Sequence, residues 1–451
     1  MASRLAIVGG DAAGMSAAST ARRRDPDLEV IAFERGPYTS YSACGVPYYV
    51  GGLFDDADRL ISRSADEHRA NGITMHMRTE VTAIDLDART LTVFDHQTRE
   101  ERAEGFDQLV VATGAEAVPP PVPGADATEP VRTVDAAERF RSALSRGGDD
   151  QHVVVVGGGY IGLEMAEALV QRSIGTTLVE AAPQVMSTLD SDMAAHVQDA
   201  AEGLGVRVLV STALEEVLLD DSGAPRAVRA GGETIEADHV IMATGVKPVV
   251  GIAQEAGIEL GPSGAVRVDD HQRCPGHDGV FAAGDCAESW HRLLQRPVNI
   301  QLGTHANKQG RIAGANATGG DLAFPGVIGT AVSRLCRYEV TRTGISEREA
   351  AEAGIDIVAA EIKDRTRAGY FPGAGPIWIK LVCDPGTGRL LGGQIVGVEG
   401  AAKRIDVLAT CVWAGLTVDE IELLDLGYAP PYSAVYDPVL VAARATRKRL
   451  A

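Results

Sequence analysis

The chain has 451 residues, of which 45% are hydrophobic and 23% charged, so we expect a globular protein of two or three domains rather than a disordered chain. Acidic side chains number 62 against 42 basic ones, and a net charge of −20 repels phosphate backbones and anionic lipid heads, which argues against nucleic acid or a membrane as partner. No stretch approaches the roughly 20 apolar residues of a membrane span, and six scattered cysteines favour the reducing cytoplasm.

The first segment, RLAIVGGDAAGMSAASTARRRDPDLEVIAFERG (residues 4–36), predicts a buried strand, a glycine-rich turn, a helix of small residues and a second strand that ends at Glu34. The turn runs from Gly9 to Gly14, with Asp11 where a middle glycine is usual. An acid about 20 residues past such a turn can reach an adenosine ribose hydroxyl, while the turn's amides hold a pyrophosphate. This segment therefore predicts a dinucleotide-binding fold.

The next motif, SYSACGVPYYVGG (residues 40–52), contains Cys44, and because the next cysteine is Cys274, no near neighbour can form a disulfide with it. Pro47 suits the first turn of a helix, which would put Cys44 at a helix N-terminus where the dipole favours the thiolate. Gly45 leaves room for a flat cofactor. The motif predicts a thiol that cycles through a mixed disulfide or a sulfenic acid, and the alternative is an inert buried cysteine.

A second copy of the same order follows in HVVVVGGGYIGLEMAEALVQRSIGTTLVEAAP (residues 152–183), with a turn from Gly157 to Gly162 and a closing acid at Glu180. Each copy is followed by alternating strands and then by a strand that enters Ala-Thr-Gly, at residues 112–114 and 243–245. Because the whole pattern is duplicated, it favours two dinucleotide-binding folds over glycine turns that merely connect strands.

Glu180 bears on the choice of nicotinamide cofactor. NADPH sites usually place Arg or Lys just after this acid, but here Ala181, Ala182 and Pro183 follow. A 2′-phosphate beside an unpaired carboxylate is unfavourable, so we expect NADH to be preferred and NADPH to be possible. The alternative is that Glu180 is a solvated strand end.

A third motif, GVFAAGDCAES, is a short apolar strand that ends in Gly284 and Asp285. The glycine lets the backbone approach a phosphate, and the aspartate can accept a hydrogen bond from a ribitol hydroxyl, which suits a flavin. With this motif the chain resembles the pyridine nucleotide-disulfide oxidoreductases along nearly its whole length. In that family the aspartate at the Asp285 position binds FAD.

The resemblance implies an α/β fold with two Rossmann-like dinucleotide-binding domains and a C-terminal α+β dimerisation domain. The FAD-binding domain would be discontinuous, residues 1–114 and 246–325, with the NAD(P)H-binding domain at 115–245 and the interface domain at 326–451. Strand-like runs at Ile377–Cys383 and Leu390–Val396 and a helix at Arg404–Ala414 suit the last of these. The family forms homodimers in which each active site is completed by the partner subunit.

Tyr160 and Glu164 lie on the first turns of the second glycine-rich helix, and their i, i+4 spacing puts both on one face. Family members use a tyrosine at the Tyr160 position as a gate that moves aside for nicotinamide, and a glutamate at the Glu164 position beside the flavin. The alternatives are a packed aromatic ring for Tyr160 and a capping or surface role for Glu164.

The Cys44 motif resembles the single-cysteine branch of the family, which comprises coenzyme A-disulfide reductases, NADH oxidases and NADH peroxidases. Oxidases and peroxidases carry a histidine in the first glycine-rich turn where this chain has Ala12. Coenzyme A-disulfide reductases instead use two tyrosines of the partner subunit, and Tyr370 in RAGYFPGA and Tyr428 in GYAPPYSAVYDPV stand in the matching motifs. The chain is therefore most similar to the coenzyme A-disulfide reductases.

The chain departs from the family motif at Tyr41, where phenylalanine is common, and at Ala43, where asparagine is frequent, so the resemblance indicates disulfide reduction more strongly than coenzyme A as the substrate. Arg22 could meet coenzyme A phosphates or form part of a solvated basic face, and Ser40 and Asn307 are further candidates for substrate binding. The chain stops soon after the interface domain, so we expect no fused sulfurtransferase domain. The remaining cysteines match no catalytic pattern, and the histidines show no ligand spacing, so no metal is expected.

The resemblance implies the following contacts with FAD or the nicotinamide nucleotide: Gly9, Asp11, Ala12, Ala13, Gly14, Glu34, Arg35, Ser42, Val81, Ala112, Thr113, Gly114, Gly157, Gly159, Tyr160, Ile161, Gly162, Glu164, Glu180, Gly245, Gly284, Asp285 and Ala306. The expected protein is a homodimeric FAD enzyme that reduces a small disulfide with NADH through Cys44, with Tyr370 and Tyr428 as further catalytic residues. The rivals are an NADH oxidase or peroxidase, and a flavin-bearing redox sensor with negligible turnover.

Overall fold

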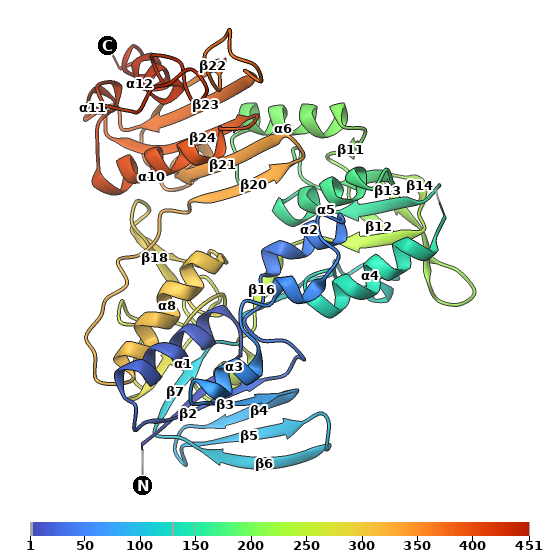
Figure 1. Cartoon of the computed structure of the whole chain (residues 1–451), viewed down its shortest axis with the longest axis vertical. Coiled ribbons are helices and arrows are strands. Elements are labelled where there is room, and N and C mark those ends of the chain that lie inside the picture. Colours follow the sequence, from blue (N-terminus) through green and yellow to red (C-terminus); the bar gives the residue numbers. More distant parts are fainter. Residues whose placement is uncertain (1–2, 129, 149, 451) are drawn as a thin grey trace. The chain divides into compact units, whose positions relative to one another are not determined.

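The computed structural model describes residues 3–128, 130–148 and 150–450 (Figure 1). Its chain forms two compact units. The first unit comprises residues up to Val46, Asp56–Val118 and Val246–Val327, and the second comprises Pro47–Asp55, Pro119–Gly245 and the residues from Ile328 on. The predicted division into an FAD-binding domain, an NAD(P)H-binding domain and an interface domain stays a prediction.

The first unit is built on a parallel sheet of order β17-β7-β1-β2-β3. Its strands are β1 (Arg4–Val8), β2 (Glu29–Glu34), β3 (Ile73–Met77), β7 (Gln108–Val111) and β17 (Val280–Ala282). Side chains alternate along β1: Leu5 and Ile7 pack on one face, and Ala6 and Val8 pack on the other. The strands are buried on both faces, as expected for a parallel sheet covered by two layers.

Two helices, α1 (Ala12–Arg24) and α8 (Gly303–Asn316), cover the Leu5 face. They approach closely because α8 carries glycine at its contacts: a Cβ at Gly310 would lie 2.1 Å from the carbonyl oxygen of Ala13, and one at Gly314 would lie 2.2 Å from that of Ala17. The helix of small residues predicted after the first glycine turn is thus confirmed, and its small side chains permit this packing.

The opposite face is covered by an antiparallel sheet of β4 (Thr79–Asp85), β5 (Thr90–Asp95) and β6 (Glu100–Gly105), from which Val81, Ile84 and Leu91 enter the core. Smaller elements complete the first unit: α3 (Ala65–Ala70), β8 (Ala115–Ala117), β16 (Val246–Pro248), α7 (Gly251–Glu255), β18 (Ser289–His291) and β19 (Arg296–Val298).

The second unit repeats this architecture. A parallel sheet of order β11-β10-β9-β15 packs on one face against the helices and on the other against an antiparallel sheet, β12-β13-β14. The elements are α2 (Val46–Val50), α4 (Val134–Arg146), β9 (His152–Val156), α5 (Tyr160–Gln171), β10 (Gly175–Val179), α6 (Ser191–Gly203), β11 (Arg207–Leu209), β12 (Leu214–Leu219), β13 (Pro225–Ala230), β14 (Glu233–Glu236) and β15 (His239–Met242). The predicted duplication is confirmed.

The same unit contains a five-stranded antiparallel sheet of order β20-β21-β24-β23-β22, drawn in orange to red in Figure 1. Its elements are β20 (Ala331–Leu335), β21 (Tyr338–Gly344), α9 (Glu347–Glu352), β22 (Val358–Arg365), β23 (Pro376–Cys383), β24 (Leu390–Gly397), α10 (Ile405–Ala414), α11 (Val418–Glu422) and α12 (Pro438–Arg447). Leu335, Val340 and Val396 share a core with α5 and α6, so this sheet is joined to the nucleotide fold.

In the part of the chain that the structure describes, none of the helices combines the length and the apolar character needed to cross a bilayer. The expected fold class, α/β with two Rossmann-like folds and a C-terminal α+β part, is confirmed.

Candidate functional site

The first glycine-rich turn joins β1 to α1 and needs glycine at both ends. Gly9 has φ +109°, and a Cβ there would lie 2.1 Å from the carbonyl oxygen of Ala112, which precedes Thr113 and Gly114. A Cβ at Gly14 would lie 1.9 Å from the carbonyl oxygen of Gly9. The turn is therefore compact, and its backbone N–H groups at the start of α1 can bind a pyrophosphate.

The second turn, between β9 and α5, has the same geometry. Gly157 has φ +107°, and a Cβ there would lie 2.3 Å from the carbonyl oxygen of Ala243, while one at Gly162 would lie 1.8 Å from that of Gly157. Gly159 is the N-cap of α5, Ile161 lies in its first turn, and Gly245 has φ +99° after β15.

An acid at the end of the second strand braces each turn. Glu34 accepts hydrogen bonds from the N–H groups of Gly10, at 2.8 Å, and Gly36, at 2.7 Å. Glu180 accepts them from Gly158, at 2.6 Å, and Ala182, at 2.7 Å. Each carboxylate oxygen keeps a second lone pair, so both acids can also accept from a ribose hydroxyl.

Asp11, in the turn before α1, has a buried Oδ1 without a hydrogen-bond partner among the described residues. Burial raises the pKa of this carboxyl to about 7, and the charges of Glu34 and Asp285 add to the rise. A buried polar atom usually has a hydrogen-bond partner, and a bound dinucleotide could provide one for Asp11 Oδ1. The residues of this turn therefore fit FAD.

Gly284 follows β17 at φ +84°, with Ala13 of α1 and Ala306 of α8 so near that a Cβ would lie 2.8 and 3.5 Å from their Cβ atoms. Its N–H donates to Oε1 of buried Gln309 at 2.9 Å. The next residue, Asp285, is held through its carbonyl by Asn299 at 2.9 Å. The structure thus brings Asp285 to the same end of the sheet as the first glycine turn.

The other expected cofactor contacts lie in the first unit. Thr113 donates from its hydroxyl to the carbonyl of Val249 at 2.5 Å. Arg35 is exposed next to Glu34, and the Ser42 amide donates to the carbonyl of Leu60 at 2.8 Å. Val81 has its side chain in the core, 6% exposed, and pairs with Val93 in the β4–β5 ladder.

Cys44 lies in a short 3₁₀ turn, Ala43–Gly45, that continues directly into α2, and it is exposed. The predicted helix is present, with Pro47 as its second residue. Gly45 is required here because a Cβ would lie 2.4 Å from Cδ2 of Leu60. The turn is thus pressed against the following segment while the thiol faces outward.

The other cysteines have different surroundings. Cys274, Cys286, Cys383 and Cys411 are buried, and Cys336 is partly buried. Burial raises the thiol pKa of all five, to about 11 in Cys383 and Cys411. A thiol with a raised pKa is a poor source of thiolate, so these cysteines are suited to packing rather than catalysis.

Tyr160 and Glu164 face the same side of α5, as expected. The Tyr160 hydroxyl accepts a hydrogen bond from the Thr188 hydroxyl at 3.3 Å, and burial raises the phenol pKa. Glu164 accepts a hydrogen bond from the Ser333 hydroxyl at 3.0 Å, and burial raises its pKa to about 7. Both side chains are therefore partly buried and tied to other elements of the second unit, rather than solvated.

The three candidate substrate residues are spread over the first unit. Ser40, at φ +49°, is hydrogen-bonded to His68 at 2.9 Å, close in sequence to Cys44. Asn307 accepts from Ser16 at 2.8 Å on the exposed side of α8. Arg22 donates to the carbonyls of Pro26 and Leu28, so its guanidinium binds the segment that follows α1.

Tyr370 and Tyr428 are 79% and 49% exposed in the C-terminal part of the second unit. Other large apolar side chains are also exposed in the segment after α11: Leu423, Tyr432, Val435 and Tyr436. An apolar group of this kind is typical of a surface that another chain covers.

One group of side chains could offer ligand atoms to a metal, and the expectation that no metal is bound stays a prediction. Asp269, Asp270 and His271 place potential ligand atoms within 4.8 Å of one another. His271 is paired with Asp270 at 2.6 Å and with Asp321 at 3.0 Å, so the cluster is exposed and already paired within the chain.

The chain is similar to known proteins along most of its length. Residues 3–310 match the pyridine nucleotide-disulphide oxidoreductases, and residues 330–438 match the dimerisation domain of the same family. The chain belongs to the pyridine nucleotide-disulphide oxidoreductase family. The resemblance found in the sequence is thus confirmed.

Individual relatives cover nearly the whole chain. The NAD(P)H coenzyme A polysulfide/persulfide reductase of Pyrococcus horikoshii is 36% identical over 98% of each chain. The NADH oxidase of Methanocaldococcus jannaschii is 34% identical over 99% of each, and the coenzyme A disulfide reductase of Staphylococcus aureus is 28% identical over 95% of this chain and 96% of that one. The structure of an NAD-dependent persulfide reductase from A. fulgidus matches with a TM-score of 0.94 and 36% identity, over 99% of this chain and 83% of that one.

This oxidoreductase is therefore an FAD-dependent enzyme that takes electrons from NADH or NADPH, as the sequence predicts. Its family acts on coenzyme A disulfide, polysulfide or oxygen. The matched dimerisation domain indicates a homodimer.

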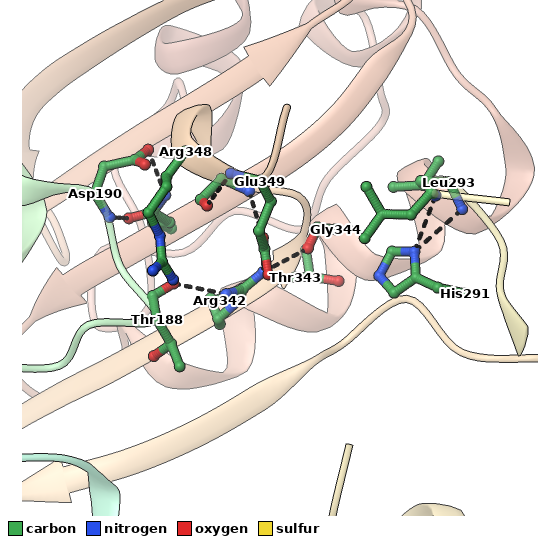
Figure 2. A network of polar contacts seen from close by, with 12 residues as sticks. Thr188, Asp190, His291, Leu293, Arg342, Thr343, Gly344, Arg348 and Glu349 are labelled. Carbon is green, nitrogen blue, oxygen red and sulfur yellow. Dashed lines mark hydrogen bonds and ion pairs between the residues drawn. The ribbon is translucent and has the colours of Figure 1, made fainter. Parts of the chain in front are cut away.

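One polar network of this oxidoreductase escaped prediction: side chains of β21, β23 and β24 contact the loop between β10 and α6 and the start of α6, and Figure 2 shows the part around Arg342, Thr188 and Asp190. Lys380, 3% exposed, pairs with Asp192 at 2.6 Å and Glu347 at 2.9 Å, and Gln394 donates to Asp190 at 2.6 Å. A lone lysine in the apolar strand PIWIKLVC was the available signal, because a buried charge requires partners.

Proposed function

We propose that this oxidoreductase reduces a small disulfide with NADH, that Cys44 is its redox-active thiol, and that coenzyme A disulfide is the favoured substrate. The observation that carries the proposal is the contrast among the cysteines. Cys44 is exposed at the turn that follows the first dinucleotide motif, whereas the other five are buried or partly buried with raised thiol pKa values. A disulfide substrate needs an accessible thiolate.

The proposed sulfur chemistry begins at the Cys44 thiolate. The Cys44 thiolate attacks one sulfur of the substrate disulfide, a new S–S bond forms, and the first thiol departs after it takes up a proton. Bound by the residues named below, FAD would supply the two electrons that cleave the mixed disulfide, with NADH as the source of the hydride. Cys44 returns to the thiolate and the second thiol leaves, so one NADH and one proton yield two thiols.

The proposed roles of the other residues follow the family pattern. The Gly9–Gly14 turn, Glu34 and Asp285 would hold FAD, and the Gly157–Gly162 turn and Glu180 would hold NADH. Tyr160 would move aside to admit the nicotinamide, with Glu164 near the flavin. We assign Tyr370 and Tyr428 of the partner subunit as phenol donors to the departing thiolate, which their exposure supports.

An NADH oxidase or peroxidase is the second candidate, because an NADH oxidase stands among the relatives. In that reaction Cys44 would pass through a sulfenic acid. Ala12, in the first turn, cannot donate a hydrogen bond to a sulfenate as a histidine could. A coenzyme A persulfide is the third candidate, since it presents the same S–S bond to a thiolate.

The test is steady-state NADH consumption by the FAD-loaded enzyme, with coenzyme A disulfide, coenzyme A persulfide, oxygen and hydrogen peroxide offered separately. The proposal expects the highest kcat/KM with coenzyme A disulfide and two thiols formed per NADH. If persulfide is used at least tenfold better, the substrate assignment is wrong although the Cys44 chemistry stands. A faster reaction with oxygen or peroxide would contradict disulfide reduction.

A further inference from the structure

The hydroxyl of Tyr160 is held by one side chain from a different part of the second unit. Thr188 donates to it at 3.3 Å, from the loop that joins β10 to α6. Tyr160 is the first residue of α5, so its backbone is fixed by the helix while the ring can turn about its side-chain bonds. The hydrogen bond from the Thr188 hydroxyl therefore favours one orientation of the Tyr160 ring.

Thr188 itself is held through its backbone, which leaves its hydroxyl available for Tyr160. Arg342 of β21 donates to the carbonyl of Thr188 at 2.6 Å, and Arg348 of α9 donates to that of Ser187 at 3.0 Å. Figure 2 shows Arg342 directed at Thr188, with Arg348 beside the same loop. Both arginines belong to the part of the chain that matches the dimerisation domain.

Arg342 has little freedom to move. It is 6% exposed, donates to the carbonyl of Gly344 at 2.8 Å and pairs with Glu349 at 2.6 Å. Two residues beyond Thr188, Asp190 accepts from the amide of Glu347 at 2.9 Å. The loop is thus fixed at both ends of the Thr188 contact, so the position of the hydroxyl is set by α9 and β21.

We propose that Thr188 is a positioning residue for Tyr160, and that the C-terminal sheet, acting through Arg342, holds the tyrosine in the orientation described here and so limits access of the nicotinamide. This proposal rests on the role of Tyr160 in the proposed function. The Thr188 hydroxyl contacts the ring in this one orientation, so the hydrogen bond must break when the ring moves aside for a nucleotide.

The consequence is an equilibrium between a closed and an open orientation of Tyr160. A hydrogen bond made in only one of two states favours that state, and it lowers the apparent affinity of any ligand that requires the other. The net effect of one such hydrogen bond corresponds to about a two- to tenfold change in an equilibrium constant. Thr188→Val removes the donor with little change in shape, so nucleotide binding should strengthen by that factor.

The experiment is calorimetric titration of the FAD-loaded dimer with NAD⁺, which binds without turnover. Thr188→Val and Tyr160→Phe should each lower the dissociation constant about two- to tenfold, and Thr188→Ser should behave as the wild type. The double variant Thr188→Val/Tyr160→Phe should gain nothing beyond either single change, because both remove the same hydrogen bond. Ser187→Ala is the matched control, since it keeps the backbone carbonyl to which Arg348 donates, and it should leave the constant unchanged.

Other results would overturn the proposal. A positioning role would be contradicted if the effects of Thr188→Val and Tyr160→Phe were fully additive, or if Thr188→Val bound NAD⁺ more weakly. It would also be contradicted if Tyr160→Phe bound NAD⁺ more tightly while Thr188→Val bound it as the wild type does. If Thr188→Val fails to fold, Thr188→Ala enters the same cycle. Anaerobic reduction of the bound flavin by NADH provides a second readout, with an apparent Kd lowered in parallel. None of these measurements involves a disulfide, so a failure of coenzyme A disulfide as substrate would be seen separately.

Discussion

Glu180 accepts a hydrogen bond of 2.6 Å from the amide of Gly158, so the acid that ends β10 is fixed against the glycine turn of the second nucleotide fold. Its other oxygen is held by Ala182 at 2.7 Å. The carboxylate therefore cannot swing away from a ligand without losing both hydrogen bonds. A nucleotide with a phosphate on its ribose would face a fixed negative charge with no cation at residues 181–183.

We therefore expect the wild-type enzyme to prefer NADH to NADPH, and Glu180→Gln to reduce the preference in kcat/KM about tenfold, because the amide keeps an acceptor oxygen and removes the charge. The measurement is steady-state turnover with each nucleotide. Glu34→Gln is the matched control, since Glu34 braces the first turn in the same way and should leave the ratio unchanged. Equal kcat/KM values for NADH and NADPH in the wild type would show that Glu180 does not determine the nucleotide preference.

Asp11 should make stability depend on pH. Burial raises its pKa to about 7, above the ordinary 3.8, so the folded protein favours the neutral acid, and a bound pyrophosphate would act in the same direction. This contribution to stability is fully present below pH 3.8 and is lost as the pH rises through 7. Asp11→Asn stays neutral at every pH. Between pH 5 and 8, the free energy of unfolding of the wild type should therefore fall by on the order of 2 kcal/mol relative to that of Asp11→Asn.

Urea unfolding of the holoenzyme at several pH values measures this difference. Asp87→Asn, at an exposed position, is the control and should follow the wild type throughout. A constant difference between Asp11→Asn and the wild type across the range would show that Asp11 is charged in the folded protein.

Gly310→Ala should destabilise the first unit, because the new Cβ would lie 2.1 Å from the backbone oxygen of Ala13 and would push α8 from α1. Overpacking against backbone costs about 1–3 kcal/mol, and we expect FAD to be retained less well since Ala13 and Ala306 lie on these two helices. Gly203→Ala, in α6 with no atom within 4 Å of the new Cβ, should be neutral or slightly stabilising. Urea unfolding and the flavin content of the purified protein are the measurements. Equal stability of the two variants would mean that α8 can shift without cost.

The two nucleotide folds could be predicted from sequence because each is local: an apolar strand, a glycine turn and a braced acid lie within about 30 residues, a pattern that alternation and glycine spacing reveal. The predicted strand at Ile377–Cys383 and the helix ending at Ala414 are likewise present as β23 and α10. These elements also carry strong periodic signals.

The hydrogen bonds that link Thr188 to Arg342 and Asp190 to Gln394 join residues 154 and 204 positions apart, and no local pattern specifies such pairs. The exposure of Cys44 also required the structure, because a cysteine between small residues is equally compatible with a core position. Both the long-range hydrogen bonds and the exposure of Cys44 depend on residues that are distant in the sequence and become neighbours only in the fold.

The most direct test of the central claim separates the two half-reactions with Cys44→Ser. Serine cannot form a mixed disulfide, whereas hydride transfer from NADH to the flavin needs no thiol. Anaerobic stopped-flow spectroscopy should show flavin reduction by NADH in both proteins, and turnover of coenzyme A disulfide should fall to background in Cys44→Ser but persist in the control Cys336→Ser. If Cys44→Ser reduces coenzyme A disulfide at the wild-type rate, Cys44 is not the redox-active thiol and the proposed mechanism is wrong.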